Sequence, residues 1–430
     1  MVLPVVSITL LVGGCSRAET AEEFRGAPQE IRSPTGTDGI NHPDVRDRDY
    51  VVLVSFDGFR HDYLDRFETP SFDQLADSGV IADALIPVFP TLTFPTHYSI
   101  ATGMYPAHHG IVGNRFYDPL RDDDFDYRDS GDAQDGSWWG AETIWLTAER
   151  QGMVAAAFFW PGTEAPIGGL QPSWWRAFDG SVANRDRVDQ VVEWLRLPAD
   201  QRPHLITVYF STVDRAGHRF GPLASELGDS IRTADGLLGR LTSAIDELPY
   251  GDRVNLVVLS DHGMAATDSE RQVIVGEVAD LSGVRSVFLG PALSLHLRGD
   301  RSRAIEIRDT FNQEVDADNA RAYLRSEAPP HLHVEDNARF GDVILLPAEG
   351  GRVAFRRDAS PPAGMHGWDP RLPSMHGIFL ARGPAIKPGQ RIPAFEGIHI
   401  YPLLTDMLDL TPNQGIDGDP SVLESLVRDR

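Results

Sequence analysis

The sequence contains little cysteine, little lysine and no long apolar run. Cys15 is the only cysteine and Lys387 the only lysine in 430 residues. A lone cysteine excludes disulfides within the chain, so a packed interior has to hold the fold. The longest apolar segment, VLPVVSITLLVGG near the N-terminus, is too short to cross a bilayer. The sequence therefore predicts no transmembrane helix.

Basic residues are few relative to acidic ones. Lys and Arg total 39 and Asp and Glu total 63, which gives a formal net charge of −24. This charge disfavours binding to nucleic-acid duplexes, because such binding depends on neutralising phosphates. The 41% of hydrophobic and 24% of charged residues are normal for a soluble globular protein. The length suffices for one large α/β domain or two ordinary ones.

The N-terminal segment has the features of an export signal. Residues 1–14 contain the apolar core of a signal peptide, and residues 12–15, VGGC, resemble a bacterial lipobox whose cysteine becomes a lipidated N-terminus. The absence of Lys and Arg before that core departs from the pattern, and an ordinary signal peptide with an incidental cysteine is the other interpretation. We expect a periplasmic or outer-membrane-anchored lipoprotein that contacts the membrane only through lipid on Cys15. The polar residues 15–48 should form a flexible tether.

From Tyr50 onward, apolar strands alternate with amphipathic helices. The expected strands are residues 50–56, 154–160, 204–210 and 254–260, and the expected helices are residues 70–79, 96–102, 185–197 and 225–248. Continuous apolar strands separated by helices are typical of a doubly wound, mainly parallel sheet with helices on both faces. We expect a catalytic domain over residues 49–412, closed by a strand at 377–383 and a helix at 398–410, with a tail at 413–430.

Residues 271–350 follow a different pattern. Short strand candidates at 284–290, 292–297 and 342–347 are mixed with a predicted helix near 316–327. We expect a smaller α+β subregion that is embedded in the main fold. The Asp-rich run 121–135 is expected to be a solvated loop.

Seven residues in five segments have metal-ligand or nucleophilic chemistry; two of the segments directly follow a predicted strand, and a third follows one a few residues later. They are Asp57, Thr93, Asp214, His218, Asp261, His262 and His366. The carboxyl ends of strands in an open α/β sheet are where ligands and catalytic groups collect. Carboxylate and imidazole donors in this proportion suit zinc or a similar divalent ion. Each residue alone would more often be structural, for example as a turn residue, but their joint appearance in this order indicates a metallohydrolase.

The motifs around these residues are long and occur in a fixed order. They are SFDGFR, PTLTFPTHYSIATGMYPAHHGIVGN, FFWPGTE, VDRAGHRFGP, LSDHGM and GMHGWDP, within residues 49–410. The set resembles the nucleotide pyrophosphatase/phosphodiesterase family of the alkaline phosphatase superfamily. The resemblance implies an alkaline-phosphatase-like fold that holds two zinc ions. It implies one zinc on Asp214, His218 and His366, and a second on Asp57, Asp261 and His262, reached by Thr93 as nucleophile.

Thr93 and Asn114 are the residues expected to act on the phosphate. A threonine hydroxyl needs activation to attack at neutral pH, which a bound zinc ion can supply. Pro95 marks a helix start, so Thr93 should lie at a helix N-terminus, where free N–H groups favour a phosphate oxygen. An ordinary N-cap is the alternative for Thr93. Asn114 matches the amide that the family uses to donate to a phosphate oxygen, although an Asn beside Gly113 could simply belong to a turn.

Several histidines compete for the ligand positions. His366 and His376 both precede a glycine, and we choose His366, with His376 as the other candidate. His331 and His333 could suggest a further metal pair, but they fall where the family has no ligand. The remaining candidates are expected to support loops around the site; they are His97, His108 and His109.

The substrate is the least determined property. Phe94 follows the nucleophile where a monoesterase commonly presents an arginine, so a diester or pyrophosphate is favoured. Phe94 and Phe178 match positions that sandwich a nucleobase in the family, although Phe178 stands where many nucleotide-cleaving members have Tyr. The resemblance thus implies release of nucleoside 5′-monophosphates through a phosphothreonine intermediate. The alternatives are a lipid or choline-type phosphodiester held against a wall that includes Trp174 and Trp175, a phosphomonoester, and a noncatalytic surface lipoprotein. The oligomeric state is left open.

Overall fold

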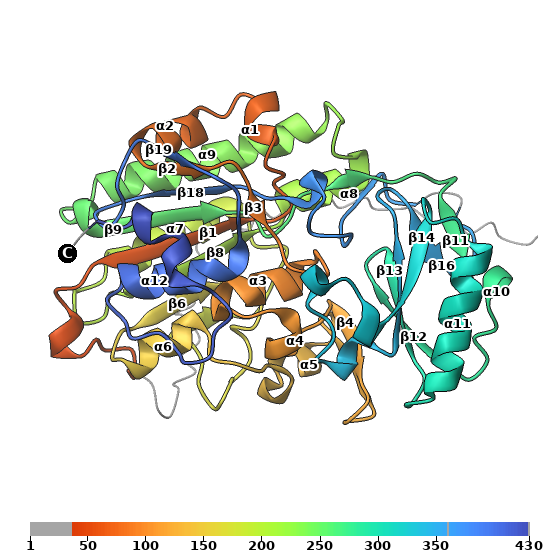
Figure 1. Ribbon diagram of the computed structural model, residues 1–430. Helices are drawn as coiled ribbons and strands as arrows, with labels where there is room; N and C mark the ends of the chain where they lie inside the picture. Colours follow the sequence, from red (N-terminus) through yellow and green to blue (C-terminus); the bar gives the residue numbers. More distant parts are fainter. Residues whose placement is uncertain (1–36, 359–360, 429–430) are drawn as a thin grey trace, which may run out of the picture.

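A computed structural model of the chain describes residues 37–358 and 361–428. The predicted signal peptide, Cys15 and most of the predicted tether lie outside these residues. The centre of the molecule is an eight-stranded sheet with helices on both faces (Figure 1). Its strands, in spatial order, are β19 (Gln390–Ile392), β2 (Val80–Ala82), β18 (Phe379–Arg382), β9 (Val254–Leu259), β1 (Tyr50–Phe56), β8 (Leu205–Phe210), β6 (Ala155–Phe158) and β7 (Trp174–Arg176).

The sheet is mainly parallel. Strand β18 is antiparallel to both of its neighbours, β9 and β2, whereas the other neighbouring pairs in this sheet are parallel. Every residue of β1 is buried, and alternate residues pack on opposite faces: Val52 and Val54 on one, Val51 and Leu53 on the other. A strand buried on both faces explains the continuous apolar run in the sequence. The prediction of a doubly wound, mainly parallel sheet is confirmed.

Two sets of helices cover the two faces. The helices packed on the first face are α2 (Pro70–Ser78), α7 (Asn184–Leu195) and α9 (Leu227–Asp246), and those on the second are α3 (Thr93–Thr102), α6 (Ile144–Arg150) and α12 (Ile400–Met407). The predicted end of the first helix at Gly79 is confirmed, because Gly79 is the C-cap of α2. The helix predicted at 96–102 begins earlier, at Thr93. This earlier start places Thr93 in the first turn of α3.

The embedded α+β subregion has its own sheet and its own apolar core. Its strands are β12 (Arg285–Leu289), β13 (Ala292–His296), β15 (Val343–Pro347) and β14 (Ala320–Leu324), packed with helix α11 (Arg301–Glu314) to one side of the main sheet (Figure 1). The helix predicted near 316–327 is wrong, because 320–324 form strand β14. Ala320, Ala322 and Leu324 are its buried residues, a period of two that a strand produces and a helix does not. The helix of this region lies earlier, at α11.

The described ends of the chain are packed against the domain. Asn41 is fully buried, and its side chain bonds the backbone of Ala199, Arg202 and Val154, so the part of the predicted tether from residue 37 onward is not free. At the other end, Leu423 and Leu426 join the main apolar core. The segment predicted as a tail is therefore packed up to residue 428. Within the described part of the chain, no helix has the length and apolar character needed to cross a membrane.

The parallel register brings the carboxyl ends of β1, β8 and β9 to one edge. Phe56 pairs with Phe210, and Ser55 pairs with Leu259, so the residues after these strands become neighbours. Gly58 permits the closest approach: it has φ +69°, and a Cβ there would lie 2.7 Å from Asp214 Cα. The Asp214 N–H donates to Asp57 O over 2.9 Å. Only glycine fits between these two segments.

Candidate metal centre

Asp57, Asp261 and His262 form an inner ligand group at the ends of β1 and β9. The side chains are 0–2% exposed. His262 Nε2 lies 3.4 Å from Asp57 Oδ1 and 3.1 Å from Asp261 Oδ2. The ligand atoms of the three residues all lie within 4.8 Å of one another. The structure thus brings together the three residues expected for one of the two metal ions.

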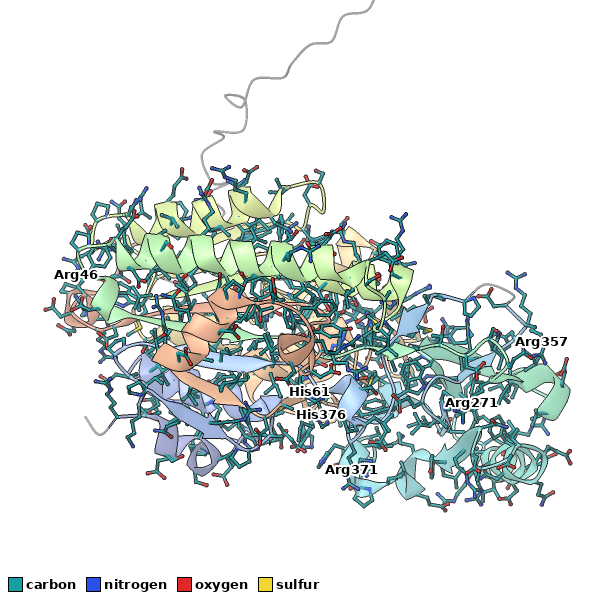
Figure 2. All side chains as sticks on the ribbon, turned by 90° about the horizontal axis from the view of Figure 1, so that it is seen from above. Arg46, His61, Arg271, Arg357, Arg371 and His376 are labelled. Atoms are coloured by element: carbon teal, nitrogen blue, oxygen red, sulfur yellow. The ribbon has the colours of Figure 1, made fainter. Side chains whose placement is uncertain are left out.

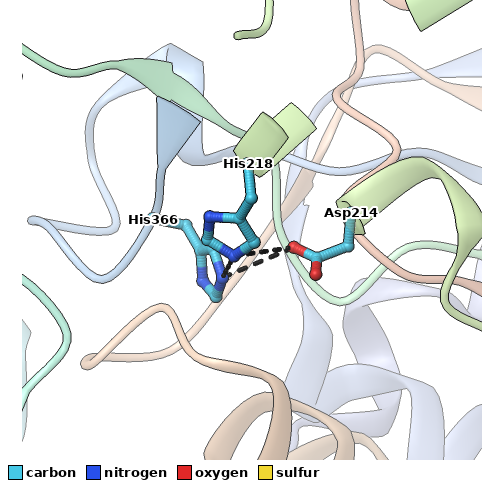
Figure 3. A group of neighbouring side chains, drawn as sticks. All are labelled: Asp214, His218 and His366. Carbon is cyan, nitrogen blue, oxygen red and sulfur yellow. Dashed lines mark hydrogen bonds and ion pairs between the residues drawn. The ribbon is translucent and has the colours of Figure 1, made fainter. Parts of the chain in front are cut away.

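Asp214, His218 and His366 form an outer ligand group beside it (Figure 3). Asp214 and His218 are four residues apart on helix α8 (Thr212–Phe220) and share one face of it, while His366 follows the short strand β17 (Gly364–Met365). His218 Nε2 and His366 Nε2 are 3.2 Å apart, and they lie 3.4 and 3.5 Å from Asp214 Oδ1. The rings of His262 and His366 stack with centroids 3.5 Å apart, so the two groups are adjacent.

The geometry of both groups fits a small tetrahedral cation. Donors bound to zinc at about 2.0–2.1 Å in tetrahedral geometry are about 3.3 Å apart, and the contacts above span 3.1 to 3.5 Å. Each histidine is also oriented through its other nitrogen: Nδ1 lies 2.8 Å from Gly364 O in His218, 2.7 Å from Thr91 O in His366 and 2.9 Å from Gly263 O in His262. A backbone carbonyl at Nδ1 requires the proton there, which leaves Nε2 free to bind a metal.

The electrostatics of the six side chains also favour a cation. Burial raises the pKa of Asp57 well above its usual range, and the carboxylates of Asp261 and Asp214 raise it further. Burial also raises the pKa of Asp214, although His218 and His262 oppose the shift. Burial lowers the pKa of His366 well below its usual value, so its imidazole is neutral and able to coordinate. Although burial opposes the shift, His262 and His97 hold the pKa of Asp261 below its usual range. Asp57 and Asp214 need further positive charge to stay ionised.

Unpaired polar atoms point to the same conclusion. Within the part of the chain that the structure describes, Asp57 Oδ1, Asp214 Oδ1 and His262 Nε2 are buried and have no hydrogen-bond partner. Buried polar atoms are normally hydrogen-bonded, and exceptions call for a ligand, an ion or water. Other buried atoms without a partner lie elsewhere in the described chain, but these three are the atoms that would bind a metal ion, so the residues present fit divalent metal ions.

Thr93 begins helix α3 beside the inner ligand group and lines the same cavity as Asp57. The N-cap of α3 is Leu92, so the alternative in which Thr93 serves as an ordinary N-cap does not apply. Asn114 lies next to it: its Oδ1 accepts a hydrogen bond from the Phe94 N–H over 2.9 Å. This contact fixes the amide, and it turns the donor end, Nδ2, away from the helix backbone. Asn114 lines the cavity, where that NH₂ group is able to donate.

Two further residues, Tyr209 and His97, join the inner ligand group to the rest of the site, and no motif singled out Tyr209. Its hydroxyl donates to Asp57 Oδ2, and its ring lies against His97 with centroids 5.3 Å apart. His97 is fully buried; its Nδ1 lies 2.8 Å from Thr93 O and 3.2 Å from Asp261 Oδ2. Its Nε2 lies 2.8 Å from Ser55 Oγ. His97 thus connects the segment that carries Thr93 to the ends of β1 and β9.

A cavity of about 560 Å³ opens over both ligand groups, a volume typical of small-molecule sites. Phe94 and Phe178 both line it. Phe94 is backed by Tyr127 and Trp139, with centroids 5.1 and 6.0 Å from its own ring. Phe178 is 52% exposed and packs edge-on against Phe159. The cavity therefore offers two aromatic surfaces, one supported from behind and one open to solvent.

The remainder of the expected aromatic wall is absent from the cavity. Trp174 and Trp175 belong to the edge strand β7 and do not line the cavity. The aromatic residues that do line it come from a different segment, with Phe159 and Trp160 directly after β6. The acidic run 121–135 contributes strand β5 (Asp123–Asp126) and helix α5 (Ser130–Gln134), and it also places Tyr127 against Phe94.

The other histidines lie apart from the two groups. His376 lies beside His61 (Figure 2), with ring centroids 5.9 Å apart, and its Nε2 donates to Pro370 O. His331 pairs with Asp369 over 2.8 Å, whereas the ring of His333 stacks on Tyr105 at 3.7 Å, so these two do not form a metal pair. The remaining two belong to loop contacts: His109 Nε2 is 2.9 Å from Ser99 Oγ, and His108 Nδ1 is 2.7 Å from Asp417 Oδ2.

Comparison with known proteins gives concordant matches. The family description "Type I phosphodiesterase / nucleotide pyrophosphatase" matches residues 51–369. An uncharacterised pyrophosphatase/phosphodiesterase of Schizosaccharomyces pombe is 35% identical over 379 residues, which cover 85% of this chain and 78% of that protein. The human ectonucleotide pyrophosphatase/phosphodiesterase family member 1 is 33% identical over 387 residues, 86% of this chain. The chain spans only 41% of the length of that human relative.

A solved structure extends the likeness to the fold. The murine ectonucleotide pyrophosphatase/phosphodiesterase 5, in an inactive threonine-to-alanine variant bound to AMP, has a TM-score of 0.83 and 30% sequence identity. The match covers 89% of this chain and all of the murine chain. The central sheet and its two helical layers therefore form the same fold in both proteins.

Proposed function

We propose, because the chain belongs to the type I phosphodiesterase / nucleotide pyrophosphatase family, that it hydrolyses phosphodiester and pyrophosphate bonds in nucleotides. The observation that carries the proposal is the cavity, which joins Thr93 and Asn114 to two ligand groups with metal-like donor spacing. The complex of the murine relative with AMP supports a nucleotide ligand for the same fold. The products would be nucleoside 5′-monophosphates.

Two zinc ions are the proposed cofactors. The inner ligand group of Asp57, Asp261 and His262, together with Thr93, would hold one ion, and the outer group of Asp214, His218 and His366 would hold the other. When bound, zinc supplies Lewis-acid stabilisation of phosphate charge and lowers the pKa of a coordinated hydroxyl. The Nδ1 contacts that fix each histidine, and the unpaired oxygens of Asp57 and Asp214, support this assignment.

Thr93 is the proposed nucleophile. Its Oγ1 attacks the phosphorus, and the bond from phosphorus to the leaving oxygen breaks, which gives a phosphothreonine. A water molecule then attacks the same phosphorus, regenerates the Thr93 hydroxyl and releases the nucleoside 5′-monophosphate. Asn114, held by the Phe94 N–H, donates through Nδ2 to a non-bridging phosphate oxygen. The inactivity of a threonine-to-alanine variant of the murine relative agrees with a threonine in this role.

Phe94 and Phe178 are the proposed nucleobase contacts. Stacking of a base on an aromatic ring contributes about 1–3 kcal/mol and tolerates all bases. Phe94 has its ring supported by Tyr127 and Trp139, which keeps it in place as a platform. No arginine or lysine follows Thr93 directly, so a doubly charged terminal phosphate lacks the bidentate partner that a monoesterase offers.

The test uses zinc-loaded protein on two chromogenic substrates. Thymidine 5′-monophosphate p-nitrophenyl ester should be hydrolysed at least about 100-fold faster than p-nitrophenyl phosphate, a difference of roughly 2.7 kcal/mol in transition-state stabilisation. A chelator should abolish the rate, and zinc should restore it. A preference for the monoester would favour the phosphomonoesterase alternative on the same two-metal scaffold. A rate that survives chelation would exclude the metal mechanism.

We also propose that the protein is exported and lipidated at Cys15. The names of the human and murine relatives describe ectoenzymes, which agrees with export. Labelled palmitate should be incorporated by the wild-type chain in a bacterial host and not by Cys15→Ser. Equal labelling of the two would exclude Cys15 as the lipid site, whereas cleavage without any labelling would indicate an ordinary signal peptide.

A further inference from the structure

The cavity is short of positive side chains. Among the described residues that line it, Arg128 and Arg215 are the only arginines, whereas three carboxylates, Asp57, Asp214 and Glu164, line it too. The whole chain carries a net charge of −24, so its long-range field repels anionic substrates. A substrate with several phosphates therefore depends on local cations at the cavity. The two metal ions would neutralise the phosphate that reacts, but not the phosphates beyond it.

Arg215 lies on α8 immediately after Asp214; it is exposed and lines the cavity. Its Nε and Nη2 donate to Ser211 Oγ over 3.2 and 2.8 Å, and Ser211 is itself buried. Gly180 faces this guanidinium: a Cβ there would lie 3.6 Å from Arg215 Nη2 and 3.6 Å from Phe178 Cε1. The absence of a side chain at Gly180 leaves space between the guanidinium and the ring of Phe178.

Among the described residues, 37–358 and 361–428, Arg215 forms no ion pair, although its charge is close enough to Asp214 to lower the pKa of that carboxyl. Its recorded polar contacts are the two to Ser211, and no carboxylate lies within ion-pair distance. Glu164, the cavity carboxylate outside the two ligand groups, accepts hydrogen bonds from Phe178 N over 2.7 Å and from Gln134 over 3.2 Å. Glu164 is thus engaged with the Phe178 loop and does not form an ion pair with Arg215.

A second cation increases the positive potential at this end of the cavity. Arg187 is buried beneath Phe159 and donates to Tyr209 O and Val182 O rather than to a carboxylate. Burial lowers the pKa of Arg187 to about 10, and Arg215 is among the charges that lower it further. The charge of Asp179 opposes this lowering, but neither guanidinium forms an ion pair with a carboxylate among the described residues. Two guanidiniums close enough to influence each other favour an anion from solution or from a substrate.

We propose that Arg215 is a specificity-determining residue that binds a phosphate of the substrate other than the one attacked, and so favours substrates whose leaving group carries phosphate. Nucleoside triphosphates and dinucleoside polyphosphates belong to this class. The inference rests on the proposed function, since it assigns a leaving group to the same site. A guanidinium suits the role because its planar fork binds phosphate oxygens in pairs.

The alternative to a role in binding is that Arg215 is an ordinary solvated surface arginine. The same helix contains an arginine of that kind for comparison. Arg219 lies one turn after Arg215 and is exposed like it, but it rests over Phe220 and does not line the cavity. Arg219→Ala is therefore the matched control for charge removal from α8. Arg215→Lys retains the charge but loses the planar fork.

The experiment compares two substrates that share the nucleoside and differ in the leaving group. Thymidine triphosphate releases pyrophosphate, and thymidine 5′-monophosphate p-nitrophenyl ester releases p-nitrophenolate. Arg215→Ala should lower kcat/KM for the triphosphate about tenfold more than for the ester, as expected for one charge-assisted contact at a partly solvated site. Arg215→Lys should lie between Arg215→Ala and wild type, and Arg219→Ala should match wild type. The selective loss should shrink at high salt.

Each other outcome has a defined meaning. An equal loss on both substrates, or no loss on the triphosphate, would overturn the proposal. Loss of bound zinc from Arg215→Ala would also overturn it, because Arg215 would then act through Asp214. If wild-type protein fails to hydrolyse the p-nitrophenyl ester, the proposed function fails, independently of Arg215.

Discussion

The inner ligand group has two aspartates and one histidine, the outer ligand group has one aspartate and two histidines, and their surroundings also differ. The inner side chains are at most 2% exposed and are tied to His97, Tyr209 and the Gly58 N–H. In the outer group His218 is 36% and Asp214 14% exposed, and both line the cavity. The inner group is thus preorganised beside Thr93, whereas the outer group is open to substrate and water. This difference predicts unequal effects of changes at the two groups.

The largest expected effect is at the inner group. Asp57→Asn should lower kcat/KM by more than about 100-fold. Mutating a residue that only supports a metal ligand already lowers metal affinity or activity about 10–100-fold. Asp57→Asn should also remove about one of the two metal ions per chain. Activity and zinc content measured on the same sample check both results.

The same variant should have the opposite effect on the metal-free fold. The pKa of Asp57 is raised by burial and by the Asp261 and Asp214 carboxylates, so its charge destabilises the metal-free protein. Chelated Asp57→Asn should unfold about 1 °C or more above chelated wild type, as about 1 kcal/mol corresponds to roughly 1 °C in a chain of this size. A lower unfolding temperature would contradict the crowding of charges in the inner group.

The histidines of the two groups should respond differently to added zinc. In His218→Ala, water can replace the lost donor at the exposed position, so activity should fall about 10–100-fold and recover at high free zinc. In His262→Ala, the lost side chain is fully buried and leaves a void, so recovery should be absent or weak. Rates measured across a series of buffered zinc concentrations distinguish the two variants. Identical zinc dependence would contradict the distinction between inner and outer groups.

A smaller effect is expected from a residue that orients the inner group. Tyr209→Phe keeps the ring that lines the cavity but removes the hydrogen bond to Asp57, so kcat should fall about 10-fold with little change in KM. Tyr63→Phe is the matched control, because the hydroxyl of Tyr63 is buried, has no hydrogen-bond partner among the described residues and does not line the cavity. Equal kinetics for the two variants would show that Tyr209 does not position Asp57.

The smallest effect concerns histidines away from both groups. Burial lowers the pKa of His204 and of His296 to about 4, whereas an unfolded histidine titrates near about 6.5. Between these values the unfolded chain binds protons that the folded chain does not. The stability that these two neutral histidines contribute is therefore fully present above about pH 6.5. It is lost as the pH drops toward about 4. This loss is separate from protonation of the metal ligands.

Urea unfolding at pH 7 and pH 4.5 tests the histidine contribution. His204→Gln should lose about 1–2 kcal/mol less stability than wild type between these pH values, because about 1.4 kcal/mol accompanies each unit of pKa shift. An identical loss in both proteins would mean that His204 does not titrate as its burial predicts.

The strands and the ligands were predictable because their signals are local. A run such as YVVLVSF specifies a strand that is buried on both faces, and the aspartate after it marks the strand end. The two groups of ligand residues were expected from motifs, and the structure brings both groups together. Strand β14 was predicted as a helix, because Ala and Arg favour helices and the period of two becomes evident only when β15 pairs beside it.

The residues that support the site could not be assigned from sequence, because their roles depend on tertiary contacts. In the sequence, Tyr209 is one more position in an apolar strand. Only the fold brings its hydroxyl against Asp57, which is 152 residues away. Trp174 and Trp175 stood near Phe178 in sequence, but the strand β7 takes them away from the cavity. Arg215 lies inside a recognised motif, and a role is indicated only by its position facing Gly180 and by the lack of an ion pair to it among residues 37–358 and 361–428.

The most direct measurement of the central claim is turnover and zinc content of Thr93→Ala on one sample. The inner and outer groups retain their six aspartate and histidine ligands in this variant, so about two zinc ions per chain should remain. Hydrolysis of thymidine 5′-monophosphate p-nitrophenyl ester should fall by at least about 1,000-fold, since the covalent step is lost. A rate within about tenfold of wild type, with zinc bound, would contradict Thr93 as the nucleophile of a two-metal phosphodiesterase.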